Sequence, residues 1–231
     1  KIFGEAGLLY TWKGRDENLK PVILMAHTDV VPVDPGSEAD WTHPPFSGDI
    51  ADGFIWGRGA LDCKVSVMAI LESVEWLIGT GFSPDRTVYL AFGHDEEVGG
   101  EKGAGKIAEY LRQQLVKAQW ILDEGGMIYS GDTAGIKKPA AFLGIAEKGY
   151  MTLELSVETQ GGHSSMPPDE TAIGILSKAV YTLEKHQFPA RYEGIMADMF
   201  DYLAPEMPFS GRFLFANTWL FKPVIRAANM A

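Results

Sequence analysis

The chain has 231 residues, of which 46% are hydrophobic and 22% are charged, a composition that suits one large globular domain or two modest ones. The formal net charge of −11 and the lack of a basic stripe argue against a nucleic-acid partner. The single cysteine excludes an intrachain disulfide framework and a cysteine-based zinc site, and no apolar run is long enough to span a bilayer.

The N-terminal half predicts strands and helices in alternation. Pro21–Ala26 (PVILMA) is continuously apolar, which is typical of a strand covered on both faces. Thr87–Phe92 and Ala118–Leu122 have the same character, and apolar residues at helical spacing predict helices over Lys64–Ile78 and Lys106–Leu115. This alternation indicates an α/β fold with a mostly parallel sheet flanked by helices.

Two shorter features of this half are also predicted. Gly7–Trp12 (GLLYTW) is strand-like, and Ser47–Gly57 (SGDIADGFIWG) predicts a hairpin. Asp52 and Gly53 would form its two-residue turn, because both residue types tolerate the positive φ that such a turn needs.

The pattern changes near Glu147. In Tyr150–Glu158 (YMTLELSVE) apolar and polar residues alternate, which predicts a strand of a sheet with one wet face. A helix is predicted over Thr171–His186, with Asp169 as a candidate N-cap. We therefore predict one domain over residues 1–147 and the start of a smaller α+β domain over residues 148–231.

Acidic or histidine side chains follow each of the three buried strands. The carboxyl ends of parallel strands meet at one edge of a sheet, where functional groups gather. A further acid, Asp62, ends the segment before the first long helix. The residues predicted to meet at this edge are His27, Asp29, Asp62, Asp95, Glu96, Glu97, Asp123 and Glu124.

So many carboxylates in one place repel one another unless a cation lies among them. Asp, Glu and His side chains suit Zn²⁺, Mn²⁺ or Co²⁺ in a hydrolytic site. Each residue also has an ordinary structural interpretation: a lone histidine is most often packed, a pair of glutamates is usually on the surface, and Asp62 or Asp123 could simply begin a helix or a turn. The convergence on one edge favours the metal site.

Five segments resemble those of the zinc-dependent carboxypeptidases and aminoacylases related to carboxypeptidase S and glutamate carboxypeptidase. They keep the order and spacing of that family from about Leu8 to Phe221. The resemblance is most specific to the carboxypeptidase S branch, which includes enzymes that make and hydrolyse N-fatty-acyl amino acids. The segments are LMAHTDVVPV, WTHPPFSGDIADGFIWGRGALDCKVSVMAILE, FGHDEEVGG, ILDEGG and EKGYMTLELSVETQGGHSSMPPDETAIGIL.

The resemblance implies that residues 1–147 are a catalytic metal-binding domain whose site holds two Zn²⁺ ions, with Co²⁺ or Mn²⁺ as alternatives. His27 and Asp123 would be ligands of the first metal, Asp62 would bridge both, and Glu97 would be a ligand of the second. Asp29 would support His27. The resemblance also implies a cis peptide bond between Asp62 and Cys63, and Cys63 departs from the acidic residue that is common at its position.

The resemblance further implies metal-dependent hydrolysis of a peptide or amide bond next to a C-terminal amino acid. Glu96 would be the general base that takes a proton from the attacking water. His163 would reach from the smaller lid domain of one subunit into the active site of its partner and stabilise the oxyanion. We therefore expect a peptide or an N-acyl amino acid as substrate and a homodimer formed through the smaller domain. Asp95 and His94 match the motif without an assigned chemical step.

One feature of the family pattern is not met. The family has a late histidine ligand for the second metal, whereas the last histidine here is His186. We therefore expect these residues to be a fragment that lacks an N-terminal segment, the rest of the smaller domain and the closing catalytic segment, and that is by itself inactive or holds one metal. The alternative is a truncated, non-catalytic relative that acts through its dimerisation surface. The sequence does not indicate a cellular compartment.

Overall fold

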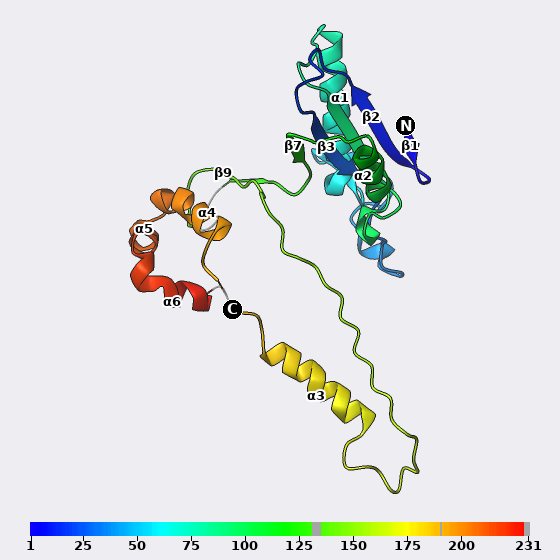
Figure 1. Cartoon of the computed structure of the whole chain (residues 1–231), viewed down its shortest axis with the longest axis vertical. Helices are drawn as coiled ribbons and strands as arrows, with labels where there is room; N and C mark the ends of the chain where they lie inside the picture. Colours follow the sequence, from blue (N-terminus) through cyan, green and yellow to red (C-terminus); the bar gives the residue numbers. More distant parts are fainter. Residues whose placement is uncertain (131–134, 190, 229–231) are drawn as a thin grey trace. The chain divides into compact units, whose positions relative to one another are not determined.

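The computed structural model describes residues 1–130, 135–189 and 191–228 (Figure 1). The chain forms two units, Lys1–Gly125 and Gly126–Ala231. The change of unit thus comes about twenty residues before the predicted domain boundary at residue 147, and the catalytic and lid roles of the two predicted domains stay predictions. No helix in the described part of the chain is long and apolar enough to cross a membrane.

The first unit contains the elements that the sequence predicts, together with short edge strands and helical turns. The short turns are η1 (Glu38–Asp40), η2 (Ala60–Lys64) and η3 (Glu96–Val98). The strands and helices are β1 (Ile2–Phe3), β2 (Gly7–Trp12), β3 (Val22–His27), β4 (Ile50–Ala51), β5 (Phe54–Ile55), α1 (Val65–Gly79), β6 (Val88–Gly93), α2 (Ala104–Gln113) and β7 (Trp120–Leu122).

A five-stranded sheet in the order β1-β2-β6-β3-β7 forms the centre of the first unit. Strand β3 runs parallel to β6 on one side and to β7 on the other, whereas β2 is antiparallel to β6 and β1 is antiparallel to β2. The three strands predicted to be buried are therefore the parallel ones, and the α/β prediction is confirmed. Burial is confirmed for β3 and β6, but the side chains of β7, the last strand of the sheet, are exposed. The antiparallel strands β1 and β2 lie on the other side of β6.

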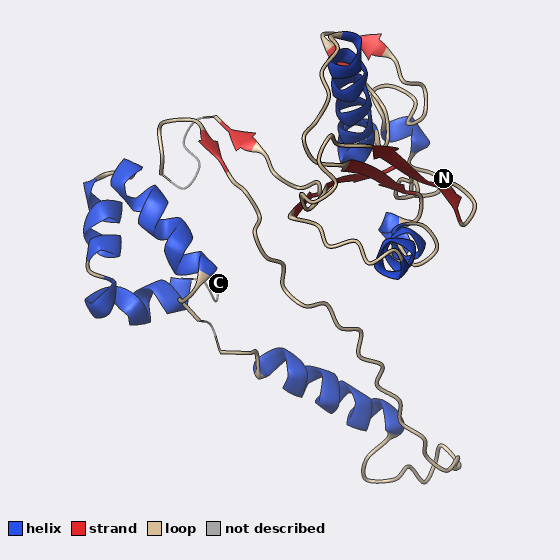
Figure 2. Cartoon of the chain, turned by 45° about the horizontal axis from the view of Figure 1, so that its top comes forward, coloured by secondary structure: helices blue, strands red, loops and turns tan. Residues whose placement is uncertain are grey.

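The two helices cover opposite faces of this sheet (Figure 2). On one face, Leu9, Ile23 and Ala91 pack against Ile107 and Leu111 of α2. The other face packs against α1, through the residues Ala26, Leu90, Phe92, Val67, Ile70, Leu71 and Val74. Alternate residues of β3 and β6 thus enter different cores, which explains why these strands are apolar at successive positions.

The hairpin prediction is confirmed. Strands β4 and β5 pair antiparallel, and Asp52 and Gly53 between them have φ values of 53° and 81°. Positive φ at both central residues is the geometry that a two-residue hairpin turn requires. This hairpin precedes the turn η2, which leads into α1.

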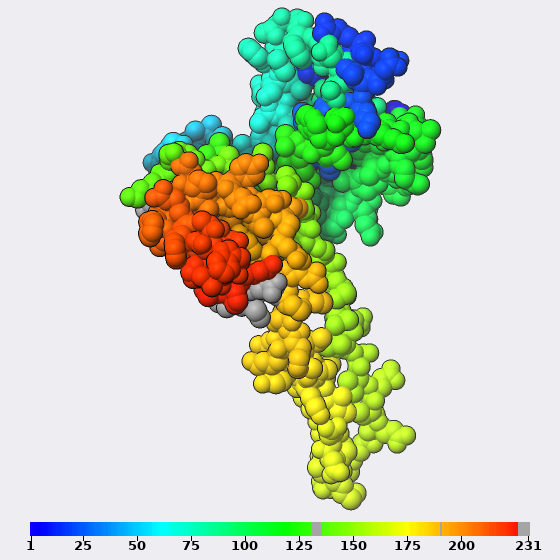
Figure 3. Space-filling model, turned by 60° about the vertical axis from the view of Figure 1, so that its left-hand side comes forward, coloured from blue at the N-terminus to red at the C-terminus, as the bar shows by residue number. Residues whose placement is uncertain are grey.

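The second unit contains a two-stranded sheet and four helices in its described residues. Its elements are β8 (Ile128–Tyr129), β9 (Ala140–Ala141), α3 (Ala172–Lys185), α4 (Ile195–Leu203), the turn η4 (Ala204–Glu206), α5 (Phe209–Ala216) and α6 (Thr218–Ala228). Phe200 of α4 stacks on Phe215 of α5 with ring centroids 4.2 Å apart, and Phe213 contacts Phe221 of α6. Figure 3 shows α4, α5 and α6, in orange and red, gathered in one mass.

The strand predicted within Tyr150–Glu158 is not formed. Residues 142–170 contain no helix or strand, and most of their side chains are exposed. An alternating pattern identifies a segment that can enter a sheet, but the backbone groups need a neighbouring strand to complete the hydrogen bonds. In the described residues no strand pairs with this segment.

The helix predicted over Thr171–His186 is confirmed as α3, but its cap differs from the prediction. Thr171 is the N-cap, and its hydroxyl accepts a hydrogen bond from the backbone N–H of Gly174 at 3.2 Å. Asp169 lies two residues before this position. A cap must accept from the second or third N–H of the first turn, and Thr171 is the residue with that spacing.

Asp95 anchors the loop that follows β6. Its two carboxylate oxygens accept hydrogen bonds from the backbone N–H groups of Lys102 at 2.7 Å and Gly103 at 2.8 Å, and the residue is 8% exposed. The missing side chain of Gly103 permits this approach, because a Cβ there would lie 2.6 Å from the Asp95 oxygen. Asp95 is thus a structural member of the acidic motif.

We predict that Asp95→Asn destabilises the first unit by about 1–3 kcal/mol, because the new amide NH₂ would face an N–H donor and leave it unsatisfied. Urea unfolding would measure the loss. Asp85→Asn is the matched control, since Asp85 is exposed and pairs only with exposed Arg15 in the described structure, and should change stability by less than about 0.5 kcal/mol. Equal stability of the two variants would contradict the anchoring role.

Candidate metal centre

His27 lies at the carboxyl end of the central strand β3 and is 2% exposed. Its Nε2 atom faces three carboxylates that come from different loops. The nearest oxygens belong to Asp62 at 3.0 Å, Glu124 at 3.4 Å and Glu96 at 3.9 Å. The strand ends therefore converge as predicted, and they enclose one imidazole in acidic groups.

The other ring nitrogen of His27 is held by Asp29. Nδ1 lies 3.1 Å from the backbone carbonyl oxygen of Asp29 and 3.2 Å from its carboxylate. A carbonyl oxygen can only accept, so Nδ1 carries the hydrogen. The second carboxylate oxygen of Asp29 accepts from the backbone N–H of Glu97 at 3.0 Å. Asp29 thus orients the ring of His27 and ties it to the loop after β6. Its supporting role at a metal stays a prediction.

The charges around His27 shift three pKa values. Burial lowers the pKa of His27, but the hydrogen bond to Asp62 and the carboxylates of Glu124, Asp29 and Glu96 outweigh it, so that the pKa is raised. Burial raises the pKa of Asp29, but hydrogen bonds from the backbone N–H groups of Glu97 and Glu96 outweigh it and lower the pKa. Burial and the neighbouring acids raise the pKa of Glu96 against the opposing effect of His27.

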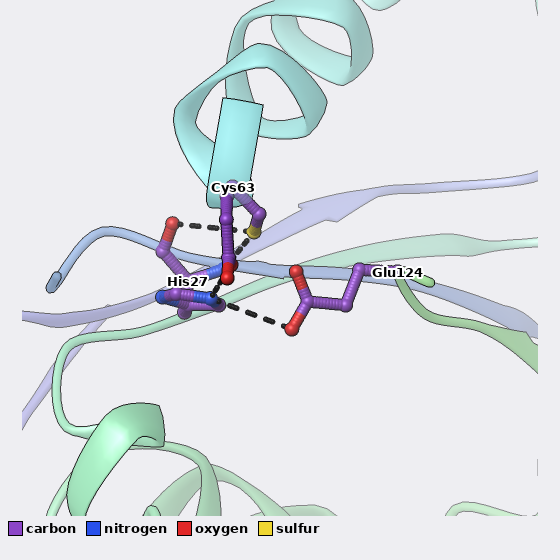
Figure 4. Close-up of side chains that lie close together, drawn as sticks. His27, Cys63 and Glu124 are labelled. Atoms are coloured by element: carbon purple, nitrogen blue, oxygen red, sulfur yellow. Dashed lines mark hydrogen bonds and ion pairs between the residues drawn. The ribbon is translucent and has the colours of Figure 1, made fainter. Parts of the chain in front are cut away.

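The turn η2 brings Asp62 and Cys63 to the same place. The peptide bond between them is cis, as predicted. The Asp62 side chain is 70% exposed and points its Oδ1 atom at His27. The Cys63 sulfur is buried beside the backbone of His27, with Glu124 approaching the ring from another direction (Figure 4). Burial raises the pKa of the Cys63 thiol to about 12.

Glu96 and Glu97 occupy different environments although they are adjacent. The Glu96 side chain is 54% exposed, and its carboxylate approaches Nε2 of His27. Glu97 is half-buried, and its Oε1 atom is buried without a hydrogen-bond partner in the described structure. Atoms of His27, Glu96 and Glu97 that can bind a metal lie within 4.8 Å of one another.

The structure brings Glu124 to the cluster in place of Asp123. Donor atoms of His27, Asp62, Cys63 and Glu124 lie within 4.8 Å of one another. The carboxylate of Asp123 instead accepts a hydrogen bond from the backbone N–H of Glu124 at 3.0 Å.

The register of the strands explains this choice. Leu122 pairs with Leu24, and continuing that register puts Glu124 beside Ala26, on the face that contains Cys63. Asp123 would be beside Met25, which packs on the opposite face. Both acids follow the strand in sequence, so only the side-chain alternation along β7 could have indicated Glu124.

The residues present fit a divalent metal ion. An ionised carboxylate only accepts hydrogen bonds, and Nε2 has no hydrogen when Nδ1 carries it, so the 3.0 Å contact with Asp62 requires a proton or a cation between the two atoms. Ligand atoms of a tetrahedral Zn²⁺ at bond lengths of about 2.0–2.2 Å lie roughly 3.4 Å apart. The observed separations of 3.0 and 3.4 Å are close to this spacing. The buried, unpartnered Glu97 oxygen is a further candidate ligand atom.

His163 lies in the second unit, and the structure does not relate it to this cluster. It is exposed, and its Nδ1 atom is 2.8 Å from the hydroxyl of Ser165. Its role at a partner's active site stays a prediction.

Residues 23–215 match the sequence model of peptidase family M20/M25/M40. The chain is 49% identical over 229 residues to a probable carboxypeptidase S-like 2 of Dictyostelium discoideum, covering 97% of this chain and 43% of the relative. It is 46% identical over 226 residues to the N-fatty-acyl-amino acid synthase/hydrolase PM20D1 of Xenopus tropicalis, covering 97% of this chain and 44% of the relative. The chain thus spans less than half the length of these curated relatives.

A solved structure also matches. The M20 family metallo-carboxypeptidase of Sulfolobus solfataricus aligns with a TM-score of 0.45 and 25% sequence identity, over 55% of this chain and 28% of that chain.

We predict that the Cys63 thiol resists alkylation in the folded protein. It is 2% exposed and its pKa is raised to about 12, so that at pH 8 its thiolate fraction is roughly a thousandfold below that of an ordinary cysteine thiol. Iodoacetamide labelling followed by mass spectrometry, with and without denaturant, would measure the rate. Equal rates in the two conditions would contradict both the burial and the raised pKa.

Proposed function

Because the chain belongs to peptidase family M20/M25/M40, we propose that its protein hydrolyses a peptide or amide bond next to a C-terminal amino acid. The observation that carries this proposal is the buried His27 imidazole with three carboxylates at its Nε2 atom. The names of the relatives support the substrate class, since a carboxypeptidase and an N-fatty-acyl-amino acid hydrolase both act on an amide bond next to a free amino-acid carboxylate.

The family implies a divalent metal, and we propose that it is zinc, with two ions in the complete site and Co²⁺ or Mn²⁺ as replacements. The proposed ligands within this chain are His27, Asp62, Glu97 and Glu124. Proximity supports Glu124 in the role that the resemblance gave to Asp123, because Glu124 is the acid whose oxygen lies 3.4 Å from His27. Asp29 orients His27 through Nδ1.

When bound, the metal would lower the pKa of a water molecule towards about 7 and polarise the scissile carbonyl. Glu96 is suited to take the proton from the attacking water. Its side chain is 54% exposed and its carboxylate lies on the Nε2 side of His27. Its raised pKa brings its basicity nearer to neutral pH, where a general base is most effective. Glu96 then gives the proton to the leaving amine.

We further propose that the protein acts as a homodimer in which His163 of one subunit serves the active site of the other. The exposure of His163 and its contact with Ser165 are compatible with an imidazole that is presented to a partner. The alternative function, a non-catalytic relative that acts through its dimerisation surface, is not favoured, since the set of acids around His27 is the one that hydrolysis would use.

Glu96→Gln tests the function directly in the full-length product of the gene that encodes this chain. We expect bound metal to remain and turnover of N-acyl amino acids or C-terminal peptide bonds to fall by about 10²–10⁴-fold, because the amide cannot accept a proton. Hydrolysis assays and elemental analysis of the same samples would measure both quantities.

The unmodified protein provides the control for this experiment. Its turnover should be abolished by a chelator and restored by zinc. Absence of both metal and turnover would overturn the proposed function, and a Glu96→Gln variant with normal turnover would remove Glu96 from the role of base.

Glu124→Gln and Asp123→Asn form a matched pair that identifies the ligand after β7. We expect Glu124→Gln to weaken zinc binding by about 10-fold or more, since the variant loses a charged ligand, and Asp123→Asn to bind zinc nearly normally. Competition with a chromogenic chelator would give both affinities. The opposite order would return the ligand role to Asp123.

A further inference from the structure

Cys63 makes two contacts with the main chain of His27. The backbone N–H of His27 donates to the sulfur at 3.2 Å, and the sulfur lies 3.6 Å from the backbone carbonyl oxygen of His27. One thiol can accept through its sulfur and donate through its S–H, so a single side chain satisfies both polar groups of this residue. These contacts are buried, where a backbone group that loses its partner cannot bond to water instead and so destabilises the fold.

Cys63 is the residue after Asp62, so its contacts with His27 also affect where Asp62 lies. The Asp62 side chain is mostly exposed, while the Cys63 side chain packs in the core with Ala26, Leu90 and Phe92. Asp62 therefore has little packing of its own to set its position. The neighbouring cysteine connects its loop to the last residue of β3, which carries the imidazole that Asp62 faces at 3.0 Å.

We propose that Cys63 is a positioning residue of the metal centre, whose sulfur ties the turn carrying Asp62 to the backbone of His27 and so sets the separation of these two ligands. This inference rests on the proposed function for its metal, but the contacts on which it depends are made by protein atoms alone. Replacement of the thiol by a methyl group would leave both backbone groups of His27 without this partner and would free the turn to move.

Serine is the conservative replacement. A hydroxyl keeps one donor and one acceptor, but N–H···O and O–H···O bonds have lengths of about 2.9 and 2.7 Å, shorter than the two sulfur contacts. The turn must therefore move closer to β3 to restore the bonds. We therefore expect Cys63→Ser to keep part of the zinc affinity that Cys63→Ala loses.

The experiment compares Cys63→Ala with Ile107→Val in the full-length protein. Ile107 of α2 is also 2% exposed, but it packs on the sheet face that α2 covers, which is opposite to the face that contains Cys63. Each variant removes one heavy atom from a core, so both lose stability. Only Cys63→Ala should weaken zinc binding, by about 10–100-fold, the loss that is typical when a group orienting a ligand is removed. Chelator competition measures the affinity, and urea unfolding of the metal-free proteins measures the stability.

Two results would overturn the positioning role. One is a zinc affinity of Cys63→Ala within about twofold of the unmodified protein, far below the loss expected for an orienting group. The other is a thiolate-to-metal charge-transfer band in the cobalt-substituted protein, which would make Cys63 a ligand itself. Absence of that band, together with the selective loss of affinity, supports the role.

A further measurement, hydrogen exchange, separates this inference from the proposed function. If the unmodified protein binds no metal, the proposed function fails, and the role of Cys63 is decided by hydrogen exchange at the His27 amide. Loss of its hydrogen bond to sulfur should make exchange in Cys63→Ala at least about tenfold faster than in Ile107→Val. Equal protection of the His27 amide in the two variants would overturn the inference.

Discussion

The buried imidazole of His27 among carboxylates is the interaction on which the candidate site depends. Carboxylates that gather this closely repel one another unless a positive charge lies among them. A protonated His27 partly offsets the negative charge of these carboxylates, and for this reason they raise its pKa. An imidazole carries at most one positive charge, whereas the acids facing its Nε2 atom are Asp62, Glu96 and Glu124. A divalent cation is the natural complement of this arrangement.

The sheet explains why these groups meet. Three parallel strands end at one edge, and the central one carries His27. Its neighbours deliver Glu96 and Glu97 after β6 and Glu124 after β7, while η2 delivers Asp62 at the start of α1. The convergence of the proposed ligands is therefore a consequence of topology, since His27, Asp62, Glu97 and Glu124 come from four different segments of the chain. Asp29 and Asp95 keep two of these connections in place through hydrogen bonds to backbone N–H groups.

The sequence predicted those parts of the fold that depend on local pattern. The apolar runs of β3 and β6, the helical periodicity of α1 and the Asp52-Gly53 turn each carry their own signal, and each is confirmed. The strand predicted within Tyr150–Glu158 failed because a strand needs a partner that its own pattern does not reveal. The choice between Asp123 and Glu124 depends on the register of β7 against β3, which is likewise a property of two segments. The sequence pattern also cannot assign different roles to Glu96 and Glu97, because they are identical residues that differ only in their surroundings.

The difference in burial among the proposed ligands has a consequence for how the site would respond to its metal. His27 is fixed by the strand, by Asp29 and by Cys63, whereas the Asp62 side chain is 70% exposed. A cation bound at His27 would therefore draw the neighbouring carboxylates towards a fixed imidazole and relieve their repulsion at the same time. Because the unfolded chain does not hold these groups together, binding would stabilise the folded state by mass action. The repulsion between these carboxylates opposes folding when no metal is bound, whereas their attraction to a bound metal would favour folding. The stability of this sheet edge would therefore depend on metal binding.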